Sequence, residues 1–175
     1  DSAALKKKFS NNEIYKKNLP SNISSRSLYN IAEKTRYEVL GGKMLKGIEK
    51  NLSENYYHKI SLKRKDQLKS KNDVSVTEAF ELYMLKNFQK IKLNPLANKM
   101  LNFWEKDFNK SISKHINYLK KNLEDQYKYS LKFSEIIQKM DFFDTEEKEN
   151  KENEENQENQ QDKQENKSDE NNSED

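Results

Sequence analysis

The chain has 175 residues, a formal net charge of +3 and a mean hydropathy of −1.27. It contains no cysteine, which excludes disulfides and thiolate metal sites, and no apolar run approaches the roughly 20 residues of a membrane-spanning helix. With no recognisable signal peptide either, we expect a cytoplasmic protein. Because the chain begins with Asp1 rather than methionine, we expect a fragment of a longer polypeptide.

Charge is unevenly distributed along the chain. Residues 145–175 contain 13 acidic residues and 4 lysines, and no Val, Ile, Leu, Met or aromatic residue. A segment of this kind has no apolar side chain whose burial could offset the entropy of ordering. We therefore predict a folded body at residues 1–144 and a disordered, acidic, low-complexity linker at residues 145–175.

The body is basic, with 29 basic and 17 acidic side chains, but only three of the basic residues are arginine. Specific base recognition and bidentate phosphate binding favour the planar guanidinium group of arginine. Lysine spread along whole helices is more typical of a solvated surface. The composition therefore disfavours specific nucleic-acid binding.

In chain order, the first 19 residues predict one or two short helices before Pro20. From Leu28 to Leu52 the apolar or small residues recur in steps of three and four, which predicts one face of a single long helix. Ser24, Ser25 or Ser27 could cap its start.

A polar loop is expected at residues 61–73 and a helix at residues 76–91. Asn94–Pro95 predicts a turn with proline at the first position of the next helix, which carries Leu96 to Phe108. A last helix would run from Ile112 to Met140. We predict an all-α fold: an irregular bundle of about four to six helices, followed by the disordered tail.

All three glycines lie in the stretch YEVLGGKMLKGIEKNL. Gly42 to Gly47 has the glycine spacing of a phosphate-binding loop, but Ile48 and Glu49 stand where a lysine and a Ser or Thr are needed, and no strand precedes it. We favour a packing role: Gly42 would lie on the apolar face of the long helix with Gly41 and Gly47 beside it, so that another helix can come close.

The other chemical motifs are weak. DVSVT at Asp73–Thr77 imitates a D-x-S-x-S metal motif, but it precedes a helix. We expect Asp73, Ser75 or Thr77 to be the N-cap of that helix, and Ser75 with Glu78 has the spacing of a capping box. His58 and His115 have no second histidine three or four residues away, so a zinc site is unsupported.

No acid–base pair is predicted either. Glu124 and Asp125 are adjacent and would point to different helix faces. Trp104 is expected to be a core residue that shares a face with Met100 and Phe108. No residue is therefore assigned as catalytic, cofactor-binding or metal-binding.

The segment AEKTRYEVLGGKMLKGIEKNL resembles the N-terminal region of the CobT subunit of aerobic, ATP-dependent cobaltochelatase. The family pattern there corresponds to Glu33, Arg36, Glu38, Gly41, Gly47, Asn51 and Leu52. The similarity resumes at VTEAFELYMLKNF, continues through MLNFWEKD with Trp104, includes Glu124, Asp125 and Gln126, and ends near QKMDFFD. An acidic linker follows in the family as it does here. The resemblance covers most of residues 1–144.

The resemblance implies a helical docking region in which these residues are structural or contact a partner. It implies assembly with an AAA+ ATPase subunit and a large chelatase subunit that inserts cobalt into hydrogenobyrinic acid a,c-diamide during cobalamin biosynthesis. The family's C-terminal von Willebrand factor A domain is not contained in these 175 residues. ATP and magnesium would bind the AAA+ partner and that domain, cobalt and corrin would bind the large subunit, and this segment would hold no cofactor and no active site.

Two alternatives stay open. The chain could be an adaptor of an AAA+ and A-domain pair that acts on a different target. It could also be a lysine-rich helical module that associates with RNA or the ribosome. A D-x-S-x-S domain downstream would support the chelatase interpretation, whereas RNA binding that weakens steeply with salt would support the last alternative.

Overall fold

The computed structural model describes residues 2–61 and 67–140. The chain divides into two units, Asp1–Lys139 and Met140–Asp175, and the fold described here is that of the first. The predicted disordered linker at residues 145–175 lies outside the described residues and stays a prediction. Part of the predicted loop at 61–73 also lies outside them.

The described residues form α-helices and short 3-10 turns and contain no strand, so the prediction of an all-α fold is confirmed. Nine α-helices lie in this part of the chain, more than the four to six expected. Their bounds are α1 Ser2–Phe9, α2 Asn12–Lys17, α3 Ile23–Met44, α4 Lys46–Ser61, α5 Val76–Phe88, α6 Pro95–Asn102, α7 Glu105–Ile112, α8 Ile116–Lys121 and α9 Gln126–Gln138, with 3-10 turns at Lys71–Asp73 and Ser113–His115.

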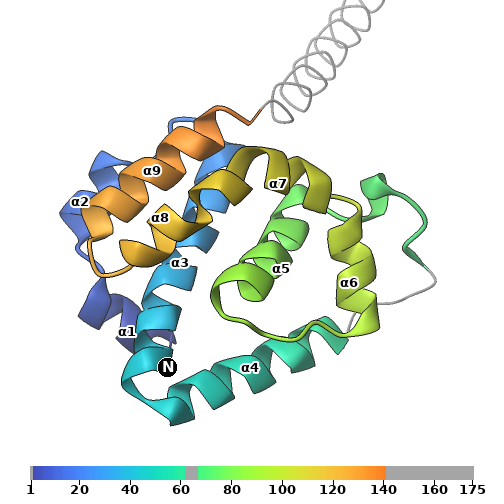
Figure 1. The fold of residues 1–175 in the computed structure, drawn as a ribbon, viewed down its shortest axis with the longest axis horizontal. Helices are drawn as coiled ribbons and strands as arrows, with labels where there is room; N and C mark the ends of the chain where they lie inside the picture. Colours follow the sequence, from blue (N-terminus) through green and yellow to red (C-terminus); the bar gives the residue numbers. More distant parts are fainter. Residues whose placement is uncertain (1, 62–66, 141–175) are drawn as a thin grey trace, which may run out of the picture. The chain divides into compact units, whose positions relative to one another are not determined.

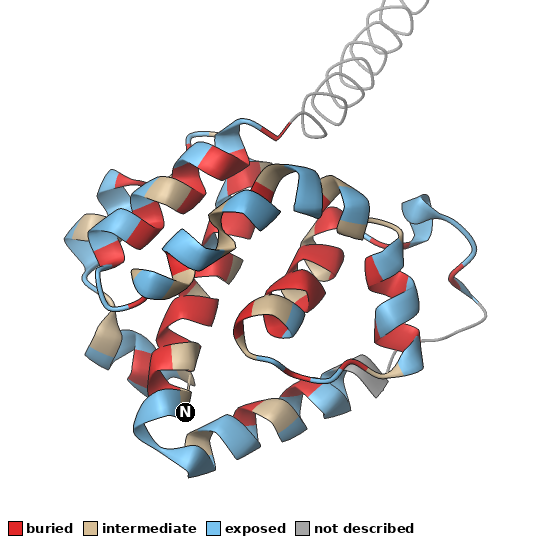
Figure 2. Ribbon diagram, viewed as in Figure 1, coloured by how far each residue is buried: buried red, intermediate tan, exposed pale blue. Residues whose placement is uncertain are grey.

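Helix α3 is the centre of the arrangement, because it packs against α1, α4, α5 and α9 (Figure 1). Among the described helices, α3 and α5 carry the largest numbers of buried residues (Figure 2). The core is aromatic: Phe80 on α5 lies edge-on to Phe108 of α7 and to Phe133 of α9, with centroids 5.5 and 6.5 Å away. Such edge-to-face pairs add to the free energy of burying the rings.

Several helix starts agree with the sequence. Ser75 caps α5, and its side chain accepts the backbone N–H of Glu78. Asn94 caps α6 with Pro95 at the first helical position. Two short helices precede Pro20, as predicted.

The prediction of one long helix from Leu28 to Leu52 is wrong. Leu45 has extended backbone angles, φ −140° and ψ 116°, so α3 ends at Met44 and α4 begins at Lys46. The apolar spacing continues through the corner because both helices bury a face in the same core. The predicted serine caps are also wrong, since Asn22 caps α3 by accepting the N–H of Ser25.

Two further predicted helices are divided. The helix expected from Leu96 to Phe108 breaks at Trp104, which is half-buried between α6 and α7 and donates its indole Nε1–H to the carbonyl of Val74 at 2.9 Å. The helix expected from Ile112 to Met140 is interrupted after α8, and Asp125 caps the start of α9. At the second break, Asn122 and Asp125 bond the backbone locally. At the first, the bond from Trp104 reaches Val74, 30 residues earlier.

Candidate functional site: two buried polar networks on helix α3

Helix α3 carries three charged residues that are almost completely buried. Glu33, Arg36 and Glu38 are 4%, 1% and 2% exposed. Charged side chains are rarely buried to this extent unless they are paired and hydrogen-bonded. The partners of these three residues form two separate clusters, named below the Glu33 network and the Glu38 network.

The Glu33 network joins α3 to α9. Ser130 donates its hydroxyl to Oε1 of Glu33, and Gln126 donates Nε2–H to Oε2 at 3.3 Å. Arg36 places Nε 3.7 Å from the same Oε2. Both carboxylate oxygens of Glu33 therefore accept hydrogen bonds from within the chain.

Arg36 extends this network to the ends of other helices. Its Nη1 donates to the carbonyl of Leu123 at 3.0 Å, and its Nη2 donates to the carbonyl of Phe9 and to Ser10 Oγ. The last carbonyls of a helix have no partner within the helix. The guanidinium group donates to one such carbonyl, that of Phe9 at the end of α1. Through its bond to Leu123 it also connects the end of α1 to the segment before α9.

Gln126 connects the network to the start of α2. Its Oε1 accepts the backbone N–H of Asn11 at 2.7 Å, and its Nε2 donates to the Asn11 carbonyl at 3.2 Å. Asn11 in turn caps α2 with its own side chain. One amide side chain thus fixes the backbone at the entry to α2 while it holds Glu33.

Burial is the main influence on ionisation in the Glu33 network. It raises the pKa of the Glu33 carboxyl, although Ser130, Arg36 and Gln126 act in the opposite direction. Burial likewise lowers the pKa of Arg36, opposed by the negative charge of Glu33. A buried pair of this type contributes through its fixed geometry, and loss of either partner leaves an uncompensated charge.

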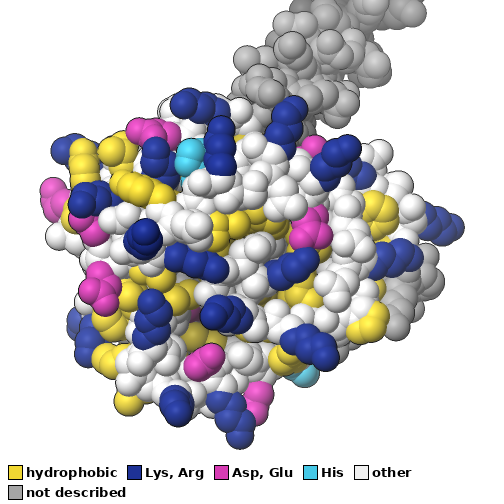
Figure 3. All heavy atoms as spheres, viewed as in Figure 1, with side chains coloured by type: hydrophobic (Ala, Val, Ile, Leu, Met, Phe, Trp, Pro, Cys, Tyr) yellow, Lys and Arg dark blue, Asp and Glu magenta, His cyan; other side chains and the backbone are white. Residues whose placement is uncertain are grey.

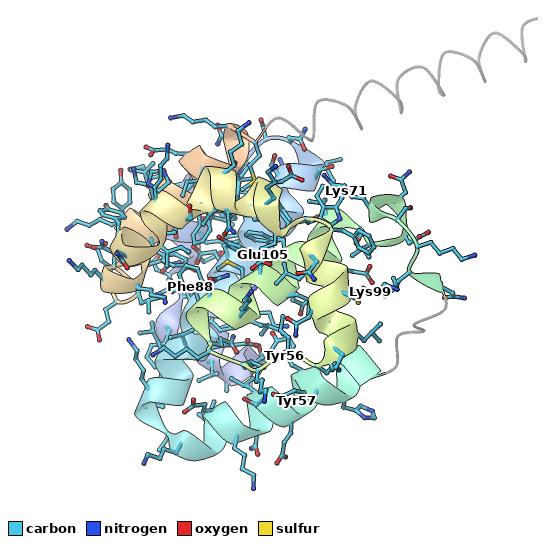
Figure 4. The ribbon with its side chains drawn as sticks, turned by 45° about the vertical axis from the view of Figure 1, so that its right-hand side comes forward. Tyr56, Tyr57, Lys71, Phe88, Lys99 and Glu105 are labelled. Carbon is cyan, nitrogen blue, oxygen red and sulfur yellow. The ribbon has the colours of Figure 1, made fainter. Side chains whose placement is uncertain are left out.

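The Glu38 network lies further along the same helix and joins α3 to α1, α4 and the residue after α5. Tyr56 and Gln89 donate to Oε2 of Glu38 at 3.0 and 2.9 Å, and Ser2 donates to Oε1 at 3.0 Å. Tyr56 lies on the side of α4 that faces the other helices (Figure 4). Burial, and then the charge of Glu38, raise the pKa of the Tyr56 hydroxyl.

The three glycines differ in how closely other residues pack against them. Gly41 is buried against Leu5 of α1, whereas nothing lies within 4 Å of a Cβ built at Gly47. The expectation that Gly42 lies on the apolar face with Gly41 beside it is wrong, because Gly41 is the buried residue and Gly42 is half-buried. The close approach predicted for Gly47 is also wrong, because Leu45 ends α3 and turns Gly47 outwards.

The remaining pattern residues have other places in the described part of the chain. Asn51 and Glu124 are exposed, and Asp125 caps α9 by accepting the N–H of Lys128. The expectation that Glu124 and Asp125 point to different helix faces is wrong, because both precede α9. Trp104 stacks on Phe108 with ring centroids 6.3 Å apart. The structure therefore brings together Glu33, Arg36 and Gln126.

Sequence reasoning missed the partners of these residues, namely Ser10, Tyr56, Gln89 and Ser130. A signal for Ser130 existed, since it lies four residues after Gln126 and therefore on the same face of α9. Tyr56 lies on α4, and Ser10 and Gln89 directly follow α1 and α5, so no local spacing connects these three residues to α3.

The described residues can also be examined for histidine positions, metal-binding groups and membrane-spanning helices. His58 is exposed and His115 half-buried. Among the described residues, no group of three or more His, Cys, Asp or Glu could hold a metal ion. No helix in this part of the chain is long and apolar enough to cross a membrane.

Comparison with known proteins gives one match. Over residues 1–175 the chain matches the family described as cobalamin biosynthesis protein CobT. No curated protein and no solved structure matches it. The match confirms the predicted resemblance to the CobT family. The chain belongs to the CobT family, and that family has its role in cobalamin biosynthesis.

Proposed function

We propose that this chain is a non-catalytic docking segment of an ATP-dependent cobaltochelatase, the complex that inserts cobalt into hydrogenobyrinic acid a,c-diamide. In this proposal an AAA+ ATPase subunit binds ATP and magnesium, and a large chelatase subunit binds cobalt and the corrin. A von Willebrand factor A domain, joined through the acidic linker, would complete the subunit. The chain contributes a rigid helical surface.

The observation that supports a docking role is the position of the charged residues on α3. Glu33, Arg36 and Glu38 are buried and bonded to residues of α1, α4 and α9. Groups held in this way fix the relative positions of helices. A fixed helical scaffold suits a surface that must transmit the movement of an ATPase to another subunit, because a rigid interface loses less conformational entropy on binding.

Binding to the AAA+ subunit tests the proposal. The full chain is immobilised and titrated with the AAA+ ATPase subunit in the presence of Mg-ATP, Mg-ADP and no nucleotide. We expect micromolar or tighter binding that depends on the nucleotide. In parallel, calorimetric titration of the chain alone with Mg-ATP should give no heat of binding.

Two results would contradict the proposal. One is the absence of any binding to the ATPase subunit in all three nucleotide conditions. The other is micromolar binding of Mg-ATP to the chain alone that is lost on Lys43→Ala. Binding of single-stranded RNA that falls steeply with the logarithm of salt concentration would instead favour the RNA-associated alternative.

A further inference from the structure

Helices α1 and α2 lie at one edge of the fold, where α1 packs against α3 and α2 packs against α9 (Figure 1). They have 8 and 6 residues, fewer than the roughly 12–15 below which an isolated helix is only marginally stable in water. Within these two described helices, Leu5 is the one buried residue. Figure 3 shows lysine side chains at the left of the view, where both helices lie. Residues 2–18, called the strap below, therefore depend on the rest of the fold for their helical structure.

Hydrogen bonds join the strap to α3 and α9, and among the described residues most of them end on buried side chains. The pairs of this kind are Ser2–Glu38, Phe9–Arg36, Ser10–Arg36, Asn11–Gln126 and Tyr15–Tyr29. The surface beneath the strap is therefore rich in polar groups. Water can hydrate these groups when the strap is lifted, so each bond adds only modestly to the free energy that holds it in place.

Three of the residues beneath the strap also have partners outside it. Glu38 accepts hydrogen bonds from α4 and from the residue after α5. Arg36 donates Nη1–H to the Leu123 carbonyl at 3.0 Å. Gln126 donates to Glu33 at 3.3 Å. Lifting the strap therefore leaves each of these buried side chains bonded within α3–α9, and the helices from α3 onwards keep their polar connections.

The apolar contacts of the strap are separate from the aromatic core of α5, α7 and α9. Leu5 belongs to a small cluster with Tyr37 and Leu52. The ring of Tyr15 lies tilted against that of Tyr29, with centroids 5.3 Å apart. Opening the strap would expose these contacts and leave the rings of the aromatic core packed against one another.

We infer that the strap opens as one unit while α3–α9 keep their fold, and that its opening gives solvent access to Arg36, Glu38 and Gln126. Openings of part of a structure occur in elements with few buried apolar contacts. The three residues are among those that carry the family resemblance, so the strap controls whether another molecule can reach them. This inference goes beyond the proposed function, whose rigid surface would be that of α3–α9.

Hydrogen exchange of the full chain, measured residue by residue by NMR in low concentrations of urea, tests the inference. The strap amides include that of Asn11, which donates to Gln126, and that of Tyr15, which donates to the Asn11 carbonyl. We expect the strap amides to share one opening equilibrium with a small dependence on urea, and protection about tenfold or more below that of α5. Protection that rises steadily from α1 to α2 would indicate fraying from the first residues and would contradict the inference.

Two variants distinguish opening of the strap from unfolding of the whole chain. Phe108→Leu weakens the aromatic core and should lower the protection of the α5 amides by about fivefold. The strap amides should stay within about twofold, because Phe108 is packed whether the strap is closed or open. Leu5→Ala should lower the protection of α1 and α2 alike, by about tenfold or more. Lys7→Ala, at an exposed position of the same helix, is the matched control and should change it by no more than about twofold.

The outcomes separate this inference from the proposed function. If Phe108→Leu lowers the protection of the strap and of α5 by the same factor, the strap opens only when the whole chain unfolds, and the inference is wrong. If Leu5→Ala affects the amides of α1 but not those of α2, the two helices do not open together, and the inference is also wrong. Binding to the ATPase subunit tests the proposed function independently, so either can fail while the other stands.

Discussion

The side chain of Leu5 lies against the backbone of Gly41, in the space that a Cβ at residue 41 would occupy. A Cβ at that position would come within 2.4 Å of Leu5 Cδ2 and 2.7 Å of Cδ1. Leu5 is 3% exposed and belongs to a small core with Tyr37 and Leu52. The missing side chain at residue 41 therefore determines how closely α1 approaches α3.

We predict opposite effects for the same substitution at two glycines. Gly41→Ala should destabilise the protein by about 1–3 kcal/mol, because Leu5 must move from a packed position. Gly47→Ala should stabilise it by about 0.5–1 kcal/mol, because alanine favours the helix and has free space there. Urea unfolding of both variants measures the two effects. Equal stabilities would contradict the packing role, and Leu5→Ala should reduce the effect of Gly41→Ala.

Arg36→Met should be strongly destabilising, by about 3–5 kcal/mol, because it leaves the buried Glu33 without a cation and the carbonyls of Phe9 and Leu123 without their donor. Adding Glu33→Gln should recover part of the loss, since it removes the unpaired charge. Arg26→Met is the control, because Arg26 is exposed and bonds only the Pro20 carbonyl among the described residues. If Arg36→Met loses no more stability than Arg26→Met, the Glu33 network does not stabilise the fold.

Lys90→Gly should raise stability by about 1 kcal/mol. Lys90 has φ 55°, in the left-handed region, which costs non-glycine residues about 1–2 kcal/mol. This conformation ends α5 and lets the backbone N–H of Ile91 donate to the Leu85 carbonyl at 3.2 Å. Gln89→Gly, one residue earlier with φ −97°, should instead destabilise, because it relieves no backbone strain and also removes the hydrogen bond from Gln89 to Glu38. Thermal unfolding distinguishes the two, and a destabilised Lys90→Gly would contradict the backbone argument.

The pKa of His115 should lie below 6.5 in the folded protein. Burial lowers it first, and then the positive charges of Lys132, Lys114 and Lys139. Since the folded state disfavours the protonated ring, its contribution to stability is present above pH 6.5 and is lost as the pH falls through the lowered pKa. NMR titration should show the pKa moving back towards 6.5 in Lys132→Met but not in Lys128→Met, and an unchanged value in Lys132→Met would exclude the charge effect.

Trp104→Phe should cost about 1 kcal/mol, because it removes the hydrogen bond to Val74 and retains a ring against Phe108. Lys71 Nζ lies 4.2 Å from the centroid of the indole ring (Figure 4 labels Lys71), so the substitution should also loosen the turn at Lys71–Asp73. Hydrogen exchange of the Val74 and Lys71 amides checks this. Unchanged exchange together with unchanged stability would show that the indole N–H has no role in holding this turn.

Features that depend on local chemistry can be predicted from the amino-acid sequence. Side chains that act on their own backbone or recur at the helical period indicate a cap before α5, with Ser75 among three candidates, the proline that begins α6 and the buried face of α5. The all-α class follows from the same period and the scarcity of glycine and proline. Because these interactions span only a few residues, a linear pattern is enough to locate them.

The positions where the long helices break, and the polar residues that contact one another, depend on how the helices pack in three dimensions. The apolar period runs through Leu45 without interruption, because α3 and α4 both face the core on either side of the corner. Gln126 reaches Glu33 across 93 residues, and Arg36 reaches the Leu123 carbonyl across 87. Contacts between residues so far apart in the sequence depend on how all the helices pack together. Helix packing is also the reason why Gly41 is buried and Gly47 is exposed, although both belong to one short stretch of sequence.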